Sequence, residues 1–555
     1  MPAVSMRAMK SAPPDVRPKL WRVDPWWSLS WFGLAALLGC VVAFGTDAGI
    51  TLDEQLQVNY GDRVLLWFSS GFEAHGALDY RNLYLYGGLF DLPAQWLSRY
   101  SPLGVYDTRH VLTALVAVAA VIAVWKMAAL LGGTQAGLIS AAFLVTTPAW
   151  VGHGLFNPKD IPFGTAAAFA VHACLRILLA PSVLSLRDVL YAGATIGVAL
   201  GIRPGGVFLF GYLGAAVVGR IALAHLSHAP HAPARAFIGS LRVRPVRLAL
   251  AFALAWLIML SAWPWAQISP LLHPLRAMVA ASKFSWPGSV LFDGRLISAR
   301  ELPWTYLPTW FLITLPETYA VAFVAALIVA WRTRSQWREA LPMVACIGLL
   351  CMSATFPVVA IIVRHAVVYD AHRHVLCVLP PLAVLAGCAT TALLRSVALP
   401  RALRVATAAI LAGLALVTWL DMSSLHPYEY TYFNRTFGGL RAAAGRFETD
   451  YWGASYREGL AWLFEHARRG TAAKVRVTWC NDAVPLDYYL QTTPSLAARF
   501  ELDPTLSKPD YWLGTTRYLC APPAGEIVHE VTREGVTLLR VVRLPGARSR
   551  AAGAR

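Results

Sequence analysis

The chain has 555 residues, of which 57% are hydrophobic and 14% are charged, with a formal net charge of +17 and a mean hydropathy of +0.51. A soluble domain usually carries about 25% charged residues, so this composition excludes an ordinary soluble protein and predicts a polytopic α-helical membrane protein. The basic residues form no stripe interleaved with aromatic residues, so we expect no nucleic-acid partner. Membrane topology and contact with anionic membrane lipids explain the positive charge instead.

Apolar runs long enough to cross a bilayer recur along most of the chain. Residues 1–25 precede them as a polar, proline-containing cytoplasmic tail, and residues 26–425 form the predicted transmembrane domain. We predict about eleven spans, each of roughly 20 apolar residues, near 27–46, 109–131, 134–150, 161–180, 188–202, 204–223, 247–266, 310–331, 340–363, 374–394 and 402–421.

Clusters of Arg and Lys predict the orientation of these spans. They lie before the first span and within 220–247, 332–338 and 395–404, all on the side of the N-terminus, which the positive-inside rule assigns to the cytoplasm. No convincing cleavage site follows the first span, so we expect it to remain as an anchor. The Ala- and Arg-rich, Lys-poor composition favours a bacterial inner membrane. The predicted outer segments are 47–108, 151–160, the turn near 203, 267–309, 364–373 and everything after about 422.

The outer loop 47–108 contains two predicted amphipathic helices at the membrane surface, in "DEQLQVNYGDRVLLWF" and "NLYLYGGLFDLPAQWLSRY". Their aromatic residues Trp67, Tyr84, Tyr86 and Trp96 are the expected interfacial anchors, because amphipathic rings favour the headgroup level. The loop is therefore large and structured enough to form part of a binding site.

From about residue 426 the composition becomes that of a soluble domain, which we predict as a small extracytoplasmic α/β domain at 426–555. "YREGLAWLFEHARRG" has helical periodicity, whereas "KVRVTWC" and "VTLLRVVRL" alternate as strands do. Cys480 and Cys520 lie in this domain, where an oxidising compartment permits but does not require a disulfide. The sequence contains no CxxC motif and no His/Cys cluster that would indicate a zinc site.

Four groups of charged residues lie near the outer ends of the predicted spans, where a charge is costly unless it faces a cavity. They are the acidic pair Asp53 and Glu54, the neighbours Lys159 and Asp160, the single Arg203, and the stretch "RHAVVYDAHRH", which contains Arg364, His365, Asp370 and Arg373. On the predicted topology all four emerge on one face, which indicates chemistry on an anionic lipid headgroup. Cationic side chains bind phosphate, and a neighbouring acid can act as a general base toward a hydroxyl.

Each group also has a purely structural interpretation. The acidic pair suits the N-terminus of the helix that follows it. Lys159 and Asp160 suit a local ion pair, and Arg203 suits an interfacial side chain that extends to the headgroups. The charges of 364–374 suit a solvated loop. The shared side of all four groups, together with the size of the outer loop, favours a joint site.

The sequence resembles the polyprenyl-phosphate-sugar-dependent glycosyltransferases of the C-type membrane fold, on the strength of "LDE" in the first outer loop and a second acid, Asp160, where the fourth span begins. This family includes protein O-mannosyltransferases and the lipid A aminoarabinose transferase, and more distantly the oligosaccharyltransferase catalytic subunit. The resemblance covers residues 25–425, and segments such as "FNPKDIPFG" and "ETDYWGASYREGLAWL" look like a bacterial subgroup. The mannosyltransferase insert between later spans is absent and the soluble tail differs from that of the aminoarabinose transferase. The acceptor therefore stays open between protein, lipid and polysaccharide.

The resemblance implies that Asp53 is the catalytic base of an inverting transfer from a polyprenyl-phosphate sugar to an acceptor hydroxyl. It also implies that Glu54 is a supporting acid and that Asp160 orients the acceptor or completes the site. The assignment of the donor phosphate to Lys159, Arg203, Arg364, His365 and Arg373 is inferred from their charge alone.

No cofactor is required for this transfer. A divalent cation held by Asp53, Glu54 and Asp160 is allowed, because carboxylates are hard oxygen ligands. Two other classes of function compete with the enzyme: a transporter or lipid flippase of cell-envelope precursors, and a non-catalytic assembly protein that binds envelope polymer. A transporter places its charged groups near the bilayer midplane, whereas the groups here lie at the outer ends of spans.

Overall fold

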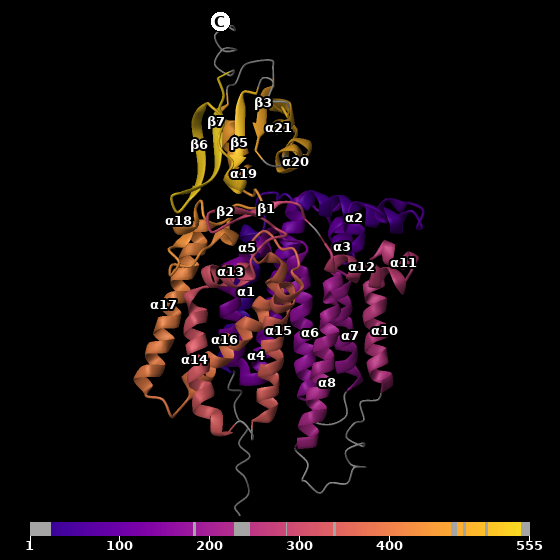
Figure 1. Cartoon of the computed structure of the whole chain (residues 1–555), viewed down its shortest axis with the longest axis vertical. Helices are drawn as coiled ribbons and strands as arrows, with labels where there is room; N and C mark the ends of the chain where they lie inside the picture. Colours follow the sequence, from indigo (N-terminus) through magenta and orange to yellow (C-terminus); the bar gives the residue numbers. More distant parts are fainter. Residues whose placement is uncertain are drawn as a thin grey trace, which may run out of the picture.

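The structure is a computed structural model that describes residues 24–180, 185–226, 245–284, 286–336, 340–467, 474–480, 484–504 and 509–545. Long helices form a bundle, and the strands of the C-terminal domain stand on one end of it (Figure 1). The predicted tail up to residue 23 and the segment 227–244 of the second basic cluster lie outside the described residues.

Seven helices of the described chain are long and apolar enough to cross a membrane, so the chain is a multi-pass membrane protein. A bent pair of helices with an angle of 101° forms an eighth span if it is counted as one. The seven are α1 (Pro25–Phe44), α4 (Val105–Val145), α6 (Asp160–Leu178), α8 (Phe208–Leu226) with the turn η3 (Pro204–Val207), α15 (Leu341–Arg364), α16 (Leu379–Arg395) with the turn η5 (Arg373–Val378), and α17 (Arg401–Leu425); the bent pair is α13 (Tyr306–Thr314) and α14 (Glu317–Thr333).

The predicted count of about eleven spans is not confirmed, because several predicted spans correspond to short or merged helices. α7 (Leu186–Leu200) has 15 residues and α10 (Pro245–Ser261) has 17, fewer than the roughly 20 that a span needs. The predicted span 109–131 and most of the predicted span 134–150 fall in α4, whose 41 residues contain a break at Gly133.

α4 folds back on itself at this break. Gly133 has a φ of 78°, a backbone conformation that glycine adopts without steric cost. A Cβ on Gly137 would lie 2.9 Å from the indole of Trp125, although a straight helix would separate these residues by roughly 18 Å. The two predicted spans are therefore the two arms of one helical hairpin.

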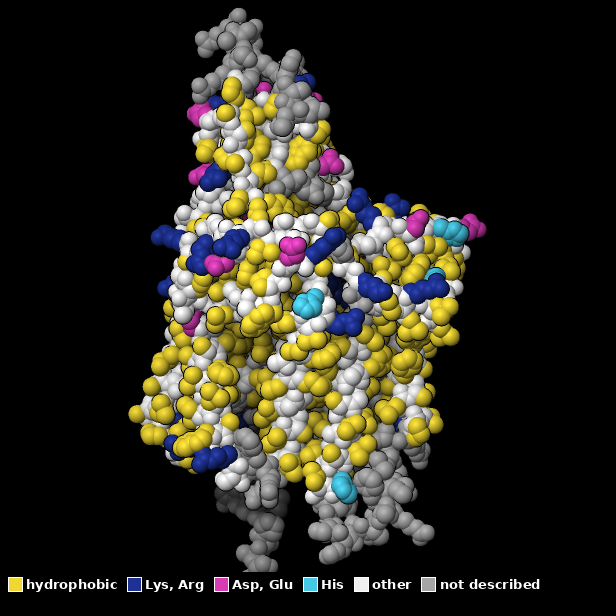
Figure 2. Space-filling view, in the orientation of Figure 1, with side chains coloured by type: hydrophobic (Ala, Val, Ile, Leu, Met, Phe, Trp, Pro, Cys, Tyr) yellow, Lys and Arg dark blue, Asp and Glu magenta, His cyan; other side chains and the backbone are white. Residues whose placement is uncertain are grey.

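The tip of this hairpin lies at the end of the bundle opposite the C-terminal domain. Arg395, at the end of α16, donates from Nε to Gln135 Oε1 and from Nη1 to the carbonyl of Gly132, both at 2.8 Å. The hydroxyl of Thr134 donates to Asp24 at the start of α1. On the face shown in Figure 2, hydrophobic side chains predominate on the helical body between this end and the junction with the C-terminal domain. The start of the first helix and the basic segment 395–404 thus lie at the same end of the helix bundle. The cytoplasmic location of this end stays a prediction.

Short helices lie across the other end of the bundle. The predicted interfacial helices correspond to α2 (Glu54–Ser69) and α3 (Asp91–Ser98), and Trp96 is exposed as expected of an anchor. The prediction for Trp67 is wrong, because its side chain is only 4% exposed and its indole donates to Gln267 Oε1 at 3.0 Å. The remaining elements of the membrane part are η1 (His75–Ala77), η2 (Leu83–Leu85), α5 (Pro148–Phe156), α11 (Pro264–Ile268), α12 (Leu272–Ser282), η4 (Arg334–Gln336), η6 (Glu429–Thr431), α18 (Gly439–Ala443) and the hairpin of β1 (Ser289–Phe292) and β2 (Arg295–Ser298).

The C-terminal domain contains a five-stranded sheet of order β4-β3-β5-β7-β6, in which β3 runs parallel to β4 and β5, and β7 runs antiparallel to β5 and β6. The predicted helix and strands are confirmed, because they coincide with α19, β3 and β7. The elements of the domain are α19 (Tyr456–His466), β3 (Val475–Trp479), α20 (Val484–Thr492), α21 (Pro494–Arg499), β4 (Phe500–Leu502), β5 (Tyr511–Thr515), η7 (Arg517–Leu519), β6 (Glu526–Arg533) and β7 (Val536–Arg543).

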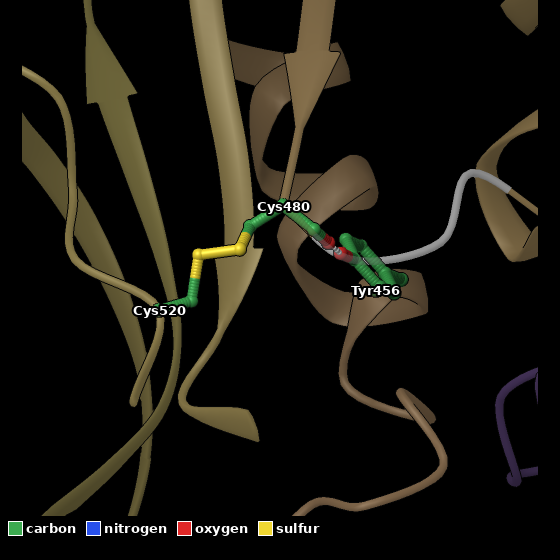
Figure 3. Close-up of a disulfide and its surroundings, with 3 residues drawn as sticks. All are labelled: Tyr456, Cys480 and Cys520. Carbon is green, nitrogen blue, oxygen red and sulfur yellow. Dashed lines mark hydrogen bonds between the residues drawn. A yellow bond between two sulfur atoms is a disulfide. The ribbon is translucent and has the colours of Figure 1, made fainter. Parts of the chain in front are cut away.

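A disulfide joins Cys480, at the end of β3, to Cys520, which follows η7 (Figure 3). The Cα atoms lie 6.5 Å apart, and the hydroxyl of Tyr456 donates to the carbonyl of Cys480 at 2.8 Å. The bond that the sequence permitted is therefore present, and it holds the turn that contains Arg517 against the sheet.

Cys480→Ser is expected to destabilise the C-terminal domain by about 4 kcal/mol, because the disulfide closes a loop of 40 residues. Chemical unfolding of the full-length protein in detergent measures this change, and Cys40→Ser, at an exposed free cysteine of α1, serves as the control. Equal unfolding midpoints for the wild type with and without reductant would contradict the prediction.

Candidate active site

Four of the predicted site residues meet in one ion-pair cluster, formed by Asp53, Asp160, Arg203 and Arg373. The guanidinium of Arg373 lies 3.3 Å from Asp53 Oδ2 and 3.5 Å from Asp160 Oδ2. Arg203 pairs with the other carboxylate oxygen of Asp160. The side chain of Asp160 is 2% exposed and that of Asp53 is 44% exposed, so Asp53 is the acid of the cluster that a substrate can contact.

Asp160 begins α6 and is the most strongly held of these acids. The side-chain amide of Asn157 donates to Asp160 Oδ2 at 2.9 Å, and the backbone N–H of Asp160 donates back to Asn157 Oδ1 at 2.8 Å. A carboxylate at a helix N-terminus is favoured by the helix dipole, and the two arginines compensate its burial. No ion pair between Lys159 and Asp160 is found in this part of the described chain, so the local-pair interpretation does not describe the site.

Lys159 lies beside the cluster without a carboxylate partner among the residues that the structure describes. Its Nζ lies 3.5 Å from the centroid of the Tyr86 ring, a cation–π contact. Close packing of Gly87 on Gly201 positions this ring, since a Cβ on Gly87 would lie 2.1 Å from the carbonyl oxygen of Gly201. Burial, reinforced by Arg203, lowers the pKa of Lys159 to about 7. An anion bound beside Lys159 would favour its protonated, positively charged form.

The acidic pair is divided between two roles. Glu54 is 1% exposed: its Oε1 lies 2.7 Å from His110 Nε2, and its Oε2 accepts from the backbone and the hydroxyl of Thr51 at 2.8 and 2.9 Å. Asp53 occupies the N-cap position of α2, as the structural interpretation expects, but its side chain makes no capping hydrogen bond to the helix. Glu54 therefore fixes the start of α2 against α4, while Asp53 faces Arg373.

Arg364 and His365 do not join the cluster. α15 continues to Arg364, and His365 ends the helix in a left-handed conformation with a φ of 47°. Both side chains are exposed, and no ion pair within the described ranges links either of them to Asp53 or Asp160. The chain turns inward only after them and buries Asp370 and Arg373. Only the second half of the charged "RHAVVYDAHRH" stretch, which contains Asp370 and Arg373, therefore contributes residues to the site.

The three acids named for a divalent cation do not form a joint metal site. The described part of the chain has no group of three or more His, Cys, Asp or Glu side chains arranged to hold a metal ion. The guanidinium of Arg373 lies between Asp53 and Asp160, and Glu54 faces His110 instead. Because the residues do not fit a metal, no step is assigned to one.

Asp370 links the cluster to the C-terminal domain. Its Oδ2 lies 3.1 Å from Arg373 Nε and accepts from the indole of Trp452 at 2.8 Å. Its Oδ1 accepts from Arg517 Nη2 at 2.5 Å. Asp370 and Ala371 both have positive φ, 55° and 59°, a strained conformation that occurs preferentially at functional sites. A buried arginine of the soluble domain thus contributes to the position of Arg373.

The segment that follows Asp450 holds the loop before Asp53. Asp450 accepts from the backbone N–H groups of residues 453–455 at 2.8 to 3.1 Å and so fixes the turn that presents Trp452. The carbonyl of Trp452 accepts from the backbone N–H of Leu52 at 3.1 Å. A Cβ on Gly49 would lie 2.0 Å from the carbonyl oxygen of Ala454, so only glycine allows this contact. The segment "ETDYWGAS", which carried part of the resemblance, therefore positions the acidic loop.

Sequence reasoning missed two contributors to the site, Trp452 and Arg517, and it named Asp370 only as one of the charges of the loop 364–374. Asp370 and Trp452 lie in stretches that the sequence analysis singled out, but nothing in those stretches indicates their partners. Arg517 has no signal in the sequence, because its contact with Asp370 joins residues 147 positions apart.

Residues 108–240 match the family described as dolichyl-phosphate-mannose-protein mannosyltransferase. The resemblance stated from the sequence is confirmed over this segment. It contains α6 and three of the residues at the site: Lys159, Asp160 and Arg203. None of the curated proteins compared with the chain matches it.

Solved structures similar to this chain include those of ArnT and of an archaeal oligosaccharyltransferase. The structure of ArnT from Cupriavidus metallidurans in the apo state has 15% identity and a TM-score of 0.48, covering 93% of this chain and 97% of that one. The same protein bound to undecaprenyl phosphate has 14% identity and a TM-score of 0.46, covering 94% and 99%. The Archaeoglobus fulgidus oligosaccharyltransferase in the apo form has 11% identity and a TM-score of 0.45, covering 87% and 66%.

Proposed function

We propose that the protein is an inverting glycosyltransferase that moves a sugar from a polyprenyl-phosphate donor to an acceptor hydroxyl at the outer face of the membrane. The observation that carries this proposal is the cluster in which a partly exposed Asp53 lies beside Arg373, with Lys159 and Arg203 adjoining it through Asp160. The family match over 108–240 supports the donor class, because the family is named for a lipid-phosphate sugar.

In this mechanism the acceptor oxygen attacks the anomeric carbon from the face opposite the donor phosphate. Asp53 accepts the proton of the acceptor hydroxyl as the new C–O bond forms. The bond from the anomeric carbon to the phosphate oxygen breaks, and its electron pair leaves with the polyprenyl phosphate. Lys159 and Arg203 stabilise the charge that develops on this phosphate. Arg373, 3.3 Å away, orients the Asp53 carboxylate.

The location of the charged residues favours an interfacial enzyme over a transporter. Asp160 is the first residue of α6, Arg373 is the first residue of the turn before α16, and Asp53 immediately precedes α2. A transporter or flippase would place such groups along the middle of its spans. A non-catalytic envelope-binding protein would not require a partly exposed acid held against a buried arginine.

Mass spectrometry of cell-envelope glycans and polyprenyl phosphates, with and without the protein, tests the proposal. We expect loss of the protein to remove one glycan modification and to raise the level of one polyprenyl-phosphate sugar. The purified protein in lipid nanodiscs should then convert that lipid to polyprenyl phosphate when the acceptor is supplied. Unchanged glycans and unchanged lipid levels would overturn the assignment.

Lys159 predicts a pH dependence of donor binding. The donor phosphodiester keeps one negative charge between pH 6 and 9, whereas Lys159, with a pKa of about 7, is protonated below that value and loses its charge above it. The KM for the donor should therefore rise as the pH increases through about 7, and binding of the donor will shift this transition upward. Lys159→Arg, which stays charged, should abolish the rise.

Lys159→Met should raise the KM for the donor by about tenfold at pH 6, the loss expected for one charge-assisted hydrogen bond. Lys283→Arg, at an exposed lysine after α12, is the matched control and should retain the wild-type profile. A wild-type profile in Lys159→Arg would show that another group causes the pH dependence.

A further inference from the structure

A cavity of about 580 Å³ lies where the C-terminal domain meets the hairpin of β1 and β2, apart from Asp53. Its walls come from the segments 444–449, 516–522 and 535–540, together with Leu291 of β1 and Arg441 of α18. None of these residues belongs to a candidate membrane span. The volume is within the range of roughly 300–1,000 Å³ that is usual for small-molecule sites.

The walls of this junction cavity carry positive charge and hydroxyl groups. Arg441, Arg517 and Arg540 line it, as do Thr449 and Thr516, whose hydroxyls lie 3.2 Å apart. Arg540 is paired with Glu530 at 2.9 Å, and Arg441 donates from Nε to the backbone carbonyl of Glu534 at 2.8 Å. No ion pair of Arg441 with a carboxylate is found in the described ranges, so its charge remains available to a ligand.

The acidic residue of the wall, Glu448, does not oppose an anion. Its side chain is 2% exposed, it accepts no hydrogen bond from a side chain that the structure describes, and Arg517 Nε lies 3.9 Å from its Oε1. Burial raises the pKa of Glu448 to about 8, and the attraction of Arg517 offsets this only in part. Burial therefore favours the neutral form of this carboxyl, which does not repel an anion in the cavity.

Arg517 connects the junction cavity with the ion-pair cluster. It lines the cavity and donates to Asp370 Oδ1 at 2.5 Å, while the other oxygen of Asp370 lies 3.1 Å from Arg373. Arg373 in turn lies 3.3 Å from Asp53. Two residues, Asp370 and Arg373, thus separate a wall of the cavity from the proposed base. The disulfide of Cys520 and the left-handed backbone of Tyr518 and Leu519 fix the turn that presents Arg517.

We propose that the junction cavity binds an anionic group, phosphate or carboxylate, on the acceptor saccharide, and that Arg517 transmits its occupancy to Asp53 through Asp370 and Arg373. Naming the ligand an acceptor rests on the proposed glycosyl transfer, whereas the binding site itself does not. Guanidinium groups bind both oxyanions in a bidentate manner. Because none of the residues that line the cavity belongs to a candidate membrane span, a saccharide is favoured as the ligand over a lipid headgroup.

The binding test uses the full-length protein in nanodiscs of phosphatidylcholine, with glucose 6-phosphate and glucuronate as anionic probes and glucose as the neutral one. We expect the two anions to bind and glucose to bind at least tenfold more weakly. Arg441→Gln and Arg540→Gln should each weaken binding of the anions by about tenfold. Arg543→Gln, on the same strand as Arg540 but paired with Glu526 and outside the cavity wall, is the matched control.

Equal binding of all three sugars, or equal affinities in Arg441→Gln and Arg543→Gln, would overturn the cavity as an anion site. A lipid arm repeats the titration in phosphatidylglycerol nanodiscs. Loss of sugar binding there would assign the cavity to a lipid headgroup and would also overturn the proposal. These outcomes do not depend on transfer activity, so they separate failure of the cavity from failure of the proposed function.

The protonation of Glu448 gives a second readout. Binding of the anions should weaken as the pH rises through about 8, because the ionised carboxylate repels them, and Glu448→Gln should remove this dependence. A pH dependence that persists in Glu448→Gln would exclude Glu448 from the wall of the anion site. The charged or titratable groups that act on Glu448 from neighbouring segments are Arg517, Asp370, Arg373, Tyr306 and Tyr451.

The coupling through Arg517 is tested by the division of effects between KM and kcat. Arg441→Gln should act mainly on the KM for the acceptor. Arg517→Gln should raise that KM and also lower kcat by about tenfold, because Asp370 and Arg373 lose their support. Arg517→Lys, which keeps the charge but not the planar guanidinium, should recover binding more than kcat. An Arg517→Gln variant that changes KM alone would show that the cavity and the cluster are not coupled.

Discussion

Asp53→Asn is expected to lower the turnover of glycosyl transfer by at least ~100-fold, the usual contribution of a positioned general base. The substitution preserves the size of the side chain but removes the group that accepts the proton of the acceptor hydroxyl. Because Asp53 is partly exposed and makes no capping bond, we expect the fold and the affinity for the donor to be retained. Single-turnover transfer in nanodiscs and a separate binding assay with the polyprenyl-phosphate sugar measure the two quantities.

Asp62→Asn provides the matched control for this experiment. Asp62 lies on the same helix, α2, with a half-exposed side chain 3.9 Å from Arg99. This substitution should leave turnover within about twofold of the wild type, because a surface ion pair contributes little. If transfer continues at the wild-type rate in Asp53→Asn, the base is another residue and the cluster serves only to bind the donor.

Arg373→Gln is expected to affect both stability and activity. Arg373 is buried against Asp53, Asp160 and Asp370, so its removal takes one of two cationic partners from each buried carboxylate and leaves Asp160 with Arg203 and Asp370 with Arg517. The loss of one partner from a buried ion pair usually costs about 3–5 kcal/mol. Turnover should also fall by about 100-fold, because Asp53 loses the group that orients it. Thermal unfolding of the detergent-solubilised protein and kcat measure the two effects.

The double variant Arg373→Gln with Asp160→Asn separates these two effects. Removal of one buried negative charge should recover part of the stability, since the energies of residues in one network are not additive. Activity should not recover. Arg395→Gln, at the opposite end of α16, is the control for a general effect on the helix. Full recovery of turnover in the double variant would show that Arg373 acts only as a structural counterion.

The sequence allowed prediction of the membrane part because long apolar runs have few other stable structures in a bilayer. It also allowed the prediction that four charged residues share one face, because each lies next to the end of an apolar run. These are Asp53, Asp160, Arg203 and Arg373. The number of spans was not predictable in the same way. Hydropathy does not show that α4 reverses at Gly133 or that α13 and α14 meet at 101°.

The division of the acidic pair illustrates a second limit of the sequence. Consecutive residues at the start of a helix point about 100° apart, so adjacent acids cannot both face one arginine. Which of them faces inward depends on the rotation of α2, and the contact of Glu54 with His110 of α4 determines that rotation. The exposure of Arg364 has a similar origin, because the length of α15 decides which residues of the charged loop turn inward.

The hydrogen bonds between the C-terminal domain and the loop before Asp53 have a consequence for biogenesis. Arg457 donates to the carbonyl of Ala48 at 2.8 Å, and the backbone N–H of Ile50 donates to the hydroxyl of Tyr489 at 2.7 Å. The ribosome therefore synthesises the loop 409 residues before Arg457 and 439 residues before Tyr489, the two residues that hold it. A nascent chain, however well inserted, therefore cannot hold the loop before Asp53 in place until the C-terminal domain has been synthesised and has folded.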